Sequence, residues 1–404
     1  MTKVLSIIMV ICICMVSILT ACTQSTVRAL TKEEESLVQS DNAFGFKIFK
    51  EIIDQEQDEN IFISPLSIAM ALGMTLNGAN GETREAMQKV LELSGLTEQE
   101  INESYESLIE LLGGLDPKVI FQIANSIWYR QGIPFREEFF DLARTYFDAE
   151  ISGLDFSDPD TLDVINGWVD ENTSGKIKEI VDEIDPLTVM FLINAIYFKG
   201  TWTYEFDEGQ TTDDLFTTAD GSQKACRMMH LTGELQYFEN SDFQVIDLPY
   251  GDGDYSMTVF LPRPGKDVDS LIAEFDENNW RQWLDSLDKN DVALYLPKFK
   301  LEYELDLNDV LTALGMGIAF EPGNADFTRM CDSGGLYIHK VKHKTFIEVN
   351  EEGTEAAAVT SVEMRLTSAP GNTTMRVDRP FMFVIRETRS QTLLFMGKIV
   401  EPGL

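Results

Sequence analysis

The chain is 404 residues long and carries 68 acidic residues against 32 basic ones, a formal net charge of -36 at pH 7. The acidic residues are spread along the chain, so the surface repels phosphate backbones and anionic lipid head groups, which excludes nucleic-acid binding. Five cysteines are too few for a disulfide scaffold, because Cys12, Cys14 and Cys22 lie in the N-terminal segment. We expect the other two, Cys226 and Cys331, to be separate buried thiols.

The first residues read as an export signal. An apolar run from Val4 to Leu19 follows Lys3 and is too short to span a membrane comfortably. It ends in Leu19-Thr20-Ala21-Cys22, which resembles the bacterial lipoprotein signal, in which the cysteine is lipidated as the leader is removed; an ordinary secretory cut near Ala21 is the alternative. We therefore expect a leader over residues 1–21, a membrane anchor on Cys22, and a tether over residues 22–36 that holds the body away from the membrane at the cell surface.

The first half of the remaining chain has helical patterns. Ser64 is a plausible N-cap with Pro65 at the first helical position, and this helix should end near Gly78. The sequence "TEQE" at 97–100 predicts a capping box that opens another helix. Between 135 and 147, apolar residues recur on one helical face.

Strand patterns dominate later in the chain. Residues 119–130 alternate in polarity, and the apolar run 188–202 is typical of a central strand covered on both faces. Further strands are predicted at 243–250, 255–262, 291–304, 336–350, 380–387 and 392–402, the last two as a hairpin. Helices first and mostly antiparallel strands later predict a single α+β domain over residues 37–404.

The sequence offers no catalytic machinery. The fragment "CDSGGL" (331–336) looks like the nucleophile loop of trypsin-like proteases, with Ser333 as nucleophile, but that chemistry needs an upstream histidine in an Ala-Ala-His-Cys setting. His230 lacks this setting, and His339 and His343 follow the serine. A Gly-rich turn leading into a strand at Leu336 explains the fragment better. On such a strand His339 and His343 would lie about 13 Å apart, too far for one zinc ion. We expect no enzyme activity, no metal and no cofactor.

The stretch "EEGTEAAAVTSVEM" (351–364) is a loop by position but a strand by pattern. Small and β-compatible residues at even positions alternate with Glu355, Ala357, Val359, Ser361 and Glu363 at period two. Its side chains are too small for an ordinary core strand.

Six ordered motifs give the chain a resemblance to a known family. They are "NIFISPLSIAMAL" (60–72), "LINAIYFKGTW" (192–202), "LPKFKLEYELDL" (296–307), "VKHKTFIEVNEEGTEAAA" (341–358), "DRPFMFVI" (378–385) and "LLFMGKIVEP" (393–402). From about residue 37 to 404 the chain resembles a serpin. The resemblance implies a large central sheet, two smaller sheets, about nine helices and an exposed reactive-centre loop over residues 351–378.

The resemblance also implies a mechanism. A serpin offers the loop as bait, forms an acyl-enzyme with the attacking serine or cysteine protease, and inserts the cleaved loop as an extra strand in its main sheet. The hinge that enters first would be Glu351, Glu352, Gly353, Thr354, Glu355, Ala356, Ala357 and Ala358. Small side chains there would let the hinge pass between two strands that are already packed, and Gly353 supplies backbone freedom.

Two residue groups carry over from the family to this sequence. Ser64, Ser67, Asn194 and His343 match the polar cluster beneath the middle of the sheet, where strands part during insertion; we name them the sheet-opening cluster. Trp202, Lys298 and Glu351 match the region where the loop enters the sheet, with Lys298 and Glu351 as an expected ion pair; we name them the loop-entry group.

The bait bond is the peptide bond that the target protease would cleave. Counting residues from the two ends of the loop places this bond at different positions. Family spacing from Glu351 puts it between Thr367 and Ser368, whereas counting back from Asp378 points to Ala369. Thr367 suits elastase-like or subtilisin-like proteases; a trypsin-like enzyme would instead cut between Arg365 and Leu366. We expect a monomer that forms covalent complexes with serine proteases. The alternative is a non-inhibitory relative that uses the fold as a binding or structural module.

Overall fold

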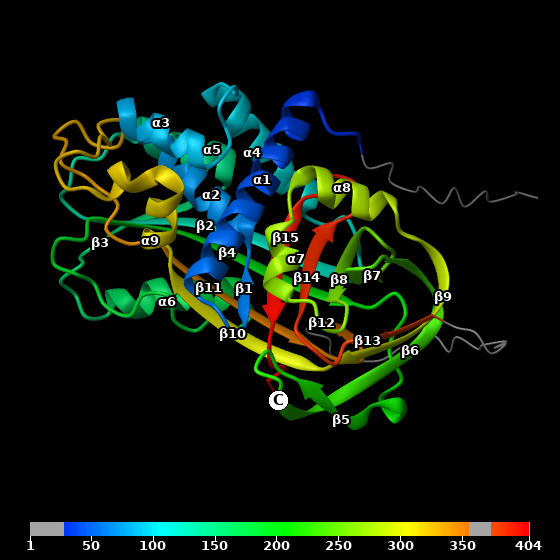
Figure 1. Cartoon of the computed structure of the whole chain (residues 1–404). Helices are drawn as coiled ribbons and strands as arrows, with labels where there is room; N and C mark the ends of the chain where they lie inside the picture. Colours follow the sequence, from blue (N-terminus) through cyan, green and yellow to red (C-terminus); the bar gives the residue numbers. More distant parts are fainter. Residues whose placement is uncertain (1–27, 355–372, 404) are drawn as a thin grey trace, which may run out of the picture.

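A computed structural model describes residues 28–354 and 373–403 of the chain (Figure 1). The helices in these ranges are α1 (Lys32–Gln55), α2 (Pro65–Leu76), α3 (Gly81–Val90), α4 (Glu98–Leu112), α5 (Glu137–Phe147), α6 (Thr161–Asn172), α7 (Val268–Ala273), α8 (Glu277–Asp285) and α9 (Asn308–Leu311). None of the described helices is long and apolar enough to cross a bilayer.

The described strands pair into two sheets. The first contains, in spatial order, β10 (Phe299–Asp306), β11 (Lys342–Val349), β12 (Gly353–Thr354), β4 (Met190–Thr201), β2 (Val119–Arg130) and β3 (Glu150–Leu154). The second runs β1 (Ile61–Ile63), β15 (Leu393–Ile399), β14 (Phe381–Glu387), β8 (Tyr255–Pro262), β7 (Phe243–Tyr250), β6 (Gln223–Glu239), β9 (Asp288–Pro297) and β13 (Thr373–Arg376), with β5 (Thr212–Thr217) also paired to β6. The predicted α+β class is confirmed.

One large sheet and two smaller ones were expected, but the described strands form two sheets. The reason lies in β6 of the second sheet. Strand β6 is 17 residues long. Its first six residues pair with β5, its last residues pair with β7, and β9 runs along most of its length. The two smaller sheets are therefore continuous through β6.

Local sequence signals account for several element boundaries. The Ser64 hydroxyl accepts a hydrogen bond from the Ser67 amide, with Pro65 in the first turn of α2. Thr97 and Glu100 form the predicted capping box of α4. Strand β2 occupies the predicted residues, and β14 and β15 form the predicted antiparallel pair.

One prediction about where a strand begins is wrong. The strand expected from Leu336 begins only at Lys342, because β10 ends at Asp306, directly opposite Lys342, and gives residues 336–341 no ladder partner. His339 therefore does not share a strand with His343. Asp332 and Ser333 form a turn that the Gly334 amide closes by donating to the Cys331 carbonyl at 3.2 Å, and Gly334 and Gly335 have φ of +66° and +77°.

Part of the range expected to be a tether belongs to the fold. Helix α1 begins at Lys32, because Thr31 and Glu34 form a capping box. Arg28 pairs with Glu34 at 2.6 Å and also contacts Ser107 of α4. Residues 28–36 therefore belong to the folded body rather than to the tether.

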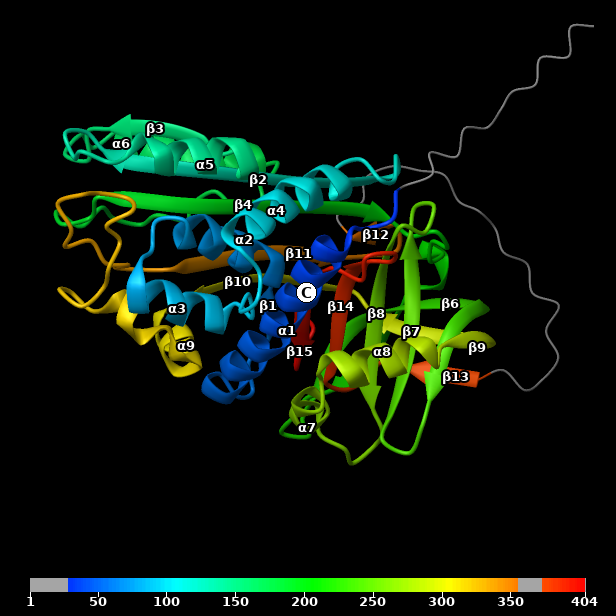
Figure 2. The same cartoon turned by 90° about the horizontal axis from the view of Figure 1, so that it is seen from above.

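Strands β2 and β4 are covered on both faces, with α2 and α6 on opposite sides (Figure 1; seen from above in Figure 2). Successive β4 residues show this division, because side chains alternate between the faces of a sheet. Ile193 joins a small cluster with Ile165 and Val169 of α6, whereas the Asn194 amide contacts Met70 of α2. The α6 cluster is separate from the main core.

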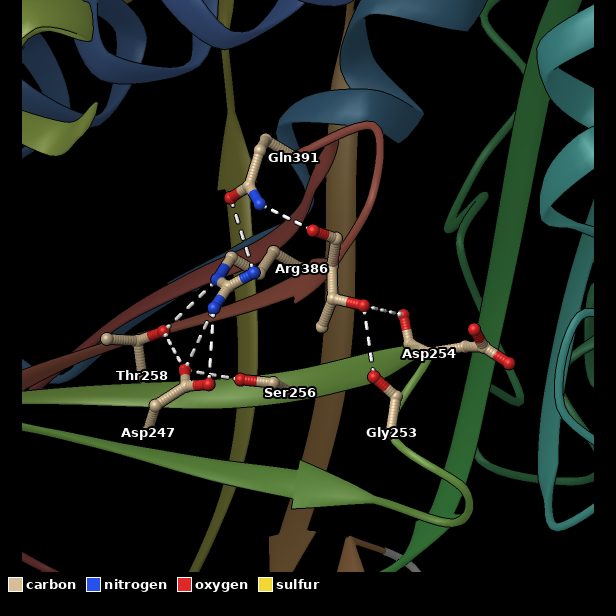
Figure 3. Close-up of polar contacts among 8 residues, drawn as sticks. Asp247, Gly253, Asp254, Ser256, Thr258, Arg386 and Gln391 are labelled. Carbon is tan, nitrogen blue, oxygen red and sulfur yellow. Dashed lines mark hydrogen bonds and ion pairs between the residues drawn. The ribbon is translucent and has the colours of Figure 1, made fainter. Parts of the chain in front are cut away.

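A buried ion pair ties the second sheet together (Figure 3). Arg386 at the end of β14 is only 5% exposed and donates to both carboxylate oxygens of Asp247 on β7, at 3.1 and 3.2 Å. Thr258 on β8 also donates to Asp247, at 2.6 Å, and Arg386 reaches Gln391 in the following turn at 3.2 Å. The network joins three strands and one turn.

Replacing Asp247 by alanine should lower the free energy of unfolding by about 3–5 kcal/mol, because the guanidinium of Arg386 would remain buried without its counter-charge. Urea denaturation measures this. The matched control is Glu234→Ala, which removes an exposed pair with Lys289 and should cost at most about 1 kcal/mol. Equal losses for the two variants would contradict the prediction.

Candidate functional site: the entry to the six-stranded sheet

The two residues of β12 lie between β11 and β4 at one end of the six-stranded sheet. Gly353 pairs with Thr201 and Thr354 pairs with Gly200 on β4, while Thr354 faces Val349 on β11. A Cβ atom on Gly353 would lie 2.1 Å from the carbonyl oxygen of Gly200. Only glycine fits this approach, because backbone atoms cannot yield as a flexible side chain can.

The loop-entry group surrounds the segment that leads into β12. The Lys298 ammonium lies 2.6 Å from a carboxylate oxygen of Glu351, and the Thr211 hydroxyl donates to the other oxygen at 2.7 Å. Glu351 is only 4% exposed. Burial raises the pKa of Glu351, but the hydrogen bonds from Lys298 and Thr211 outweigh it and lower that pKa below its ordinary value. The carboxylate stays charged in a buried position.

Trp202 is the third residue of the loop-entry group, and it binds the backbone on both sides of Glu351. Its indole N–H donates to the carbonyl of Asn350 at 3.0 Å, and its backbone N–H donates to the carbonyl of Glu352 at 2.9 Å. Its ring stacks on Tyr250 at 4.4 Å, and the Tyr250 hydroxyl lies 2.6 Å from that of Thr354. Sequence reasoning missed Thr211 and Tyr250, since nothing in their local sequences indicates that they approach the hinge.

The structure brings the four residues of the sheet-opening cluster together. The Ser64 amide donates to Nε2 of His343 at 3.0 Å, and the Ser64 hydroxyl donates to the Leu394 carbonyl at 2.7 Å. The Ser67 hydroxyl lies 3.4 Å from the Asn194 carbonyl. These contacts link the start of α2 to β4 and β11.

Asn125 is a further member that sequence reasoning missed. It lies directly opposite Asn194 in the β2–β4 pair, and its side-chain oxygen accepts from the Asn194 amide at 2.8 Å. The only signal for it is a buried-face asparagine in an otherwise apolar alternation. The second acceptor atom of Asn194, Oδ1, is buried without a hydrogen-bond partner in the described structure.

A pocket of about 430 Å³ extends from this cluster along the sheet, away from β12. Its walls are formed by α2, by the start of β4, by residues 335–344, and by residues 180–189, which we name the strap. The strap is fastened to α6 by Asn166, whose side-chain oxygen accepts from the Ile180 and Val181 amides at 3.0 Å, and Asp182 forms an ion pair with Lys342 of β11. In the described residues, β4 and β11 are joined only through β12.

The comparisons with known proteins agree with this arrangement. The family model of serpins (serine protease inhibitors) matches residues 39–402. The chain belongs to the serpin family. Human neuroserpin is 36% identical over 86% of this chain and 87% of its own length, and an uncharacterized serpin-like protein of Thermococcus kodakarensis is 34% identical over 92% and 87%.

Solved serpin structures have the same fold. The thermophilic serpin tengpin in its native state superposes with a TM-score of 0.84 at 33% identity, covering 93% of this chain and 95% of its own. Human thyroxine-binding globulin gives 0.83 at 28% identity, covering 92% and 100%. Serpins are mostly protease inhibitors rather than enzymes, so family membership supports protease inhibition in general.

The other sequence candidates have ordinary surroundings in this serpin. The Ser333 hydroxyl lies 3.0 Å from the Cys331 sulfur, and His230 stacks on Tyr295 at 4.5 Å. Cys226 and Cys331 are separate buried thiols, as predicted. Within residues 28–354 and 373–403, no group of three or more histidine, cysteine or acidic residues is placed to hold a metal ion.

Several predicted site residues of the serpin lie outside the described residues. These are Cys22, the hinge residues Glu355, Ala356, Ala357 and Ala358, and the two alternative bait bonds, Thr367–Ser368 and Arg365–Leu366. They remain predictions.

Burial lowers the pKa of His343 to about 3, so its imidazole is neutral in the folded protein. In the unfolded chain histidine titrates near 6.5. The folded-state pKa is depressed, so the stability that His343 contributes is present above pH 6.5 and is lost as pH falls toward 3. At pH 5 the loss should be about 2 kcal/mol relative to pH 7.

The measurement is urea denaturation at pH 7, 6 and 5 of the wild type and a His343→Gln variant. The variant should show a smaller loss of stability over this range. His339→Gln, which changes an exposed histidine, is the control and should keep the wild-type slope. An unchanged slope in His343→Gln would refute the role of the buried imidazole.

Proposed function

We propose that this serpin inhibits serine proteases, with cysteine proteases as a second target class, by suicide-substrate trapping. The protease cleaves the reactive-centre loop, remains bound as an acyl-enzyme, and is displaced when the loop enters the six-stranded sheet. The observation that carries the proposal is β12, because Gly353 and Thr354 already pair with β4 and extend toward the open space between β4 and β11. The alternating residues that follow have the side chains needed to continue this strand.

Insertion supplies the driving force. Each new ladder hydrogen bond contributes about 0.5–1.5 kcal/mol net, and an inserting strand gains them on both edges. From Gly353 to Met364 the strand would extend about 40 Å, so the acylated protease would be carried far along the sheet. Loss of one oxyanion-hole donor alone adds about 2.7–4 kcal/mol to the barrier of an acyl-transfer enzyme. A distorted protease would therefore leave its ester unhydrolysed.

Membrane attachment through Cys22 is part of the proposal. The Leu19-Thr20-Ala21-Cys22 sequence supports it, and the anchor would hold an exported, monomeric inhibitor at the cell surface. We expect the mature N-terminus to be a lipid-modified Cys22, to be checked by mass spectrometry of protein from membranes. A Cys22→Ser variant should appear without lipid in the soluble fraction, and a Cys22→Ser protein that still carried lipid would disprove the assignment.

The alternative is a non-inhibitory serpin that serves as a binding protein. Thyroxine-binding globulin, which is named for a small ligand, has the same fold and supports this alternative. The hinge favours inhibition, because it combines a glycine at the close backbone approach with small residues after it. Incubation with a panel of serine proteases distinguishes the two functions: an inhibitor gives a covalent complex that survives denaturation, and a binding protein gives none.

Thr354→Arg should convert the inhibitor into a substrate. Thr354 is only 3% exposed and its hydroxyl contacts Tyr250, so an arginine cannot occupy this position in the sheet. Cleavage should continue while the covalent complex is lost, as seen by denaturing gel electrophoresis. Ala358→Pro should act similarly because proline lacks the ladder donor. Undiminished trapping by Thr354→Arg would show that insertion does not drive inhibition.

The bait bond is proposed to lie between Thr367 and Ser368, with elastase-like or subtilisin-like targets. Cleavage two residues earlier, after Arg365, would shorten the inserting arm and favour plain hydrolysis over trapping. Mass spectrometry of the C-terminal fragment released from the covalent complex should find Ser368 at its start. A fragment that starts at Leu366 in a stable complex would instead assign trypsin-like targets.

A further inference from the structure

A row of three side chains crosses the outer face of the nine-stranded sheet at its β13 edge; we name it the β13 row. His230 on β6 lies opposite Tyr295 on β9, and Tyr295 lies opposite Arg376 on β13. All three residues are partly exposed, whereas Leu294 and Met375, their neighbours along the strands, are buried. Because side chains alternate between the two faces of a sheet, the row lies on the face that solvent reaches.

The β13 row is a single stack. The His230 ring lies parallel to the Tyr295 ring, with 4.5 Å between the ring centres, and the guanidinium carbon of Arg376 lies 4.8 Å from the centre of the Tyr295 ring. The imidazole is held at both nitrogens, because the Thr232 hydroxyl lies 3.0 Å from Nε2 and the side-chain oxygen of Gln210 lies 3.2 Å from Nδ1. A partner that bound this row would therefore lose little free energy in ordering its side chains.

The β13 row carries little net charge. Arg376 forms an ion pair with Asp214 of β5, and its guanidinium lies 3.7 Å from the carboxylate of Asp378. Burial lowers the pKa of His230 below its ordinary value, so the imidazole is neutral at pH 7. The row thus offers rings and a neutralised guanidinium on a chain with a formal net charge of -36. Tyrosine and arginine are among the residue types that most often anchor protein–protein interfaces.

The position of β13 brings this row close to any enzyme that cleaves the proposed bait bond. Strand β13 begins at Thr373, and Ser368 precedes it by five positions in the sequence, a length of chain that spans at most about 18 Å. A protease domain of about 230 residues has a radius of gyration of about 17 Å. An enzyme bound at this bond would therefore lie against the surface around β13, at the end of the molecule that Figure 2 shows opposite α5.

We propose that the β13 row is a docking site for the target protease, outside the contact between the bait bond and the active-site cleft of the enzyme. The inference rests on the proposed function and adds a determinant of target choice that the bait sequence does not contain. Because the row has little net charge, the matching surface of the enzyme is an uncharged loop with apolar or aromatic side chains. Docking there speeds association and leaves loop insertion unchanged.

The test compares Tyr295→Ala, which removes the central ring, with Tyr295→Phe, which keeps it. Tyr146→Ala is the matched control, because Tyr146 is a partly exposed tyrosine on α5, far from β13 (Figure 2). Thr374→Trp adds bulk at an exposed position of β13 beside the row, so it still tests the site if Tyr295→Ala does not fold.

The probe is whichever of subtilisin, pancreatic elastase and trypsin the wild type traps fastest. Three quantities are measured: the second-order rate constant of trapping, the number of inhibitor molecules consumed per trapped protease, and the Kd for the same protease with its catalytic serine replaced by alanine. The third quantity reports docking alone, because a protease without its nucleophile cannot start loop insertion.

Tyr295→Ala should trap about tenfold more slowly and bind the inactive protease about tenfold more weakly, as the loss of an aromatic anchor predicts. Thr374→Trp should be slowed in the same way, and the inhibitor consumed per trapped protease should stay at the wild-type value in both variants. Tyr295→Phe and Tyr146→Ala should behave like the wild type. The loss should persist at about 1 M salt, where charges are screened within about 3 Å.

Wild-type rates and Kd values in the folded Tyr295→Ala and Thr374→Trp variants would overturn the inference. So would an equal loss in Tyr146→Ala, a loss that disappears at high salt, or a variant that consumes more inhibitor while it docks as tightly as the wild type. A wild type that traps none of the three proteases would instead refute the proposed function, and the docking site with it.

Discussion

The backbone contact between Gly353 and Gly200 is the constraint on which the functional end of the molecule depends. Where the chain enters between β4 and β11, its backbone passes so close to the Gly200 carbonyl that no side chain fits, and Gly353 occupies that position. The residues around it hold the chain there by three different interactions: the Lys298–Glu351 ion pair, the Trp202 hydrogen bonds and the contact of Thr354 with Tyr250. Beyond Thr354, no described strand separates β4 from β11. The chain from Asn350 to Thr354 is thus held in position at the entry between β4 and β11.

The two walls of the pocket pack against hydrophobic clusters of different size. The inner wall, α2 with the sheet-opening cluster, packs on the main hydrophobic core. The outer wall, the strap with α6, has a small cluster of its own around Ile165 and Val169. Separate clusters open with separate free energies, and a smaller one opens more readily. In the proposed insertion, the outer wall would therefore be the one that yields, while the inner wall would keep its geometry.

Much of the fold could be predicted from the sequence, because its signals are local. Caps at Ser64 and Thr97 and the alternation in 119–130 each determine an element within about ten residues. The same kind of signal, Thr31 with Glu34, was present for α1 and was overlooked in favour of a tether. The strand predicted from Leu336 failed for a different reason: its pattern is right, but a strand also needs a neighbour.

The site was predicted only where family motifs supplied the long-range information. Ser64, Ser67, Asn194 and His343 lie far apart in sequence, and the structure brings them together. Asn125, Thr211 and Tyr250 act through partners on other strands, so no window of sequence around them reveals their contacts. Side chains that meet across a sheet are specified by register, which the sequence of a single strand does not contain.

The docking of Arg28 on Glu34 and Ser107 changes the distance at which this protein would work. A tether that ran from Cys22 to residue 36 would let the body range about 50 Å from the lipid, whereas a chain from Cys22 to Arg28 reaches at most about 20 Å. With a lipid on Cys22, the start of the folded body would stay within about 20 Å of the membrane surface. Its loop would meet the enzymes that come to the cell surface, and the strongly acidic body would be kept from settling onto anionic head groups by its own charge.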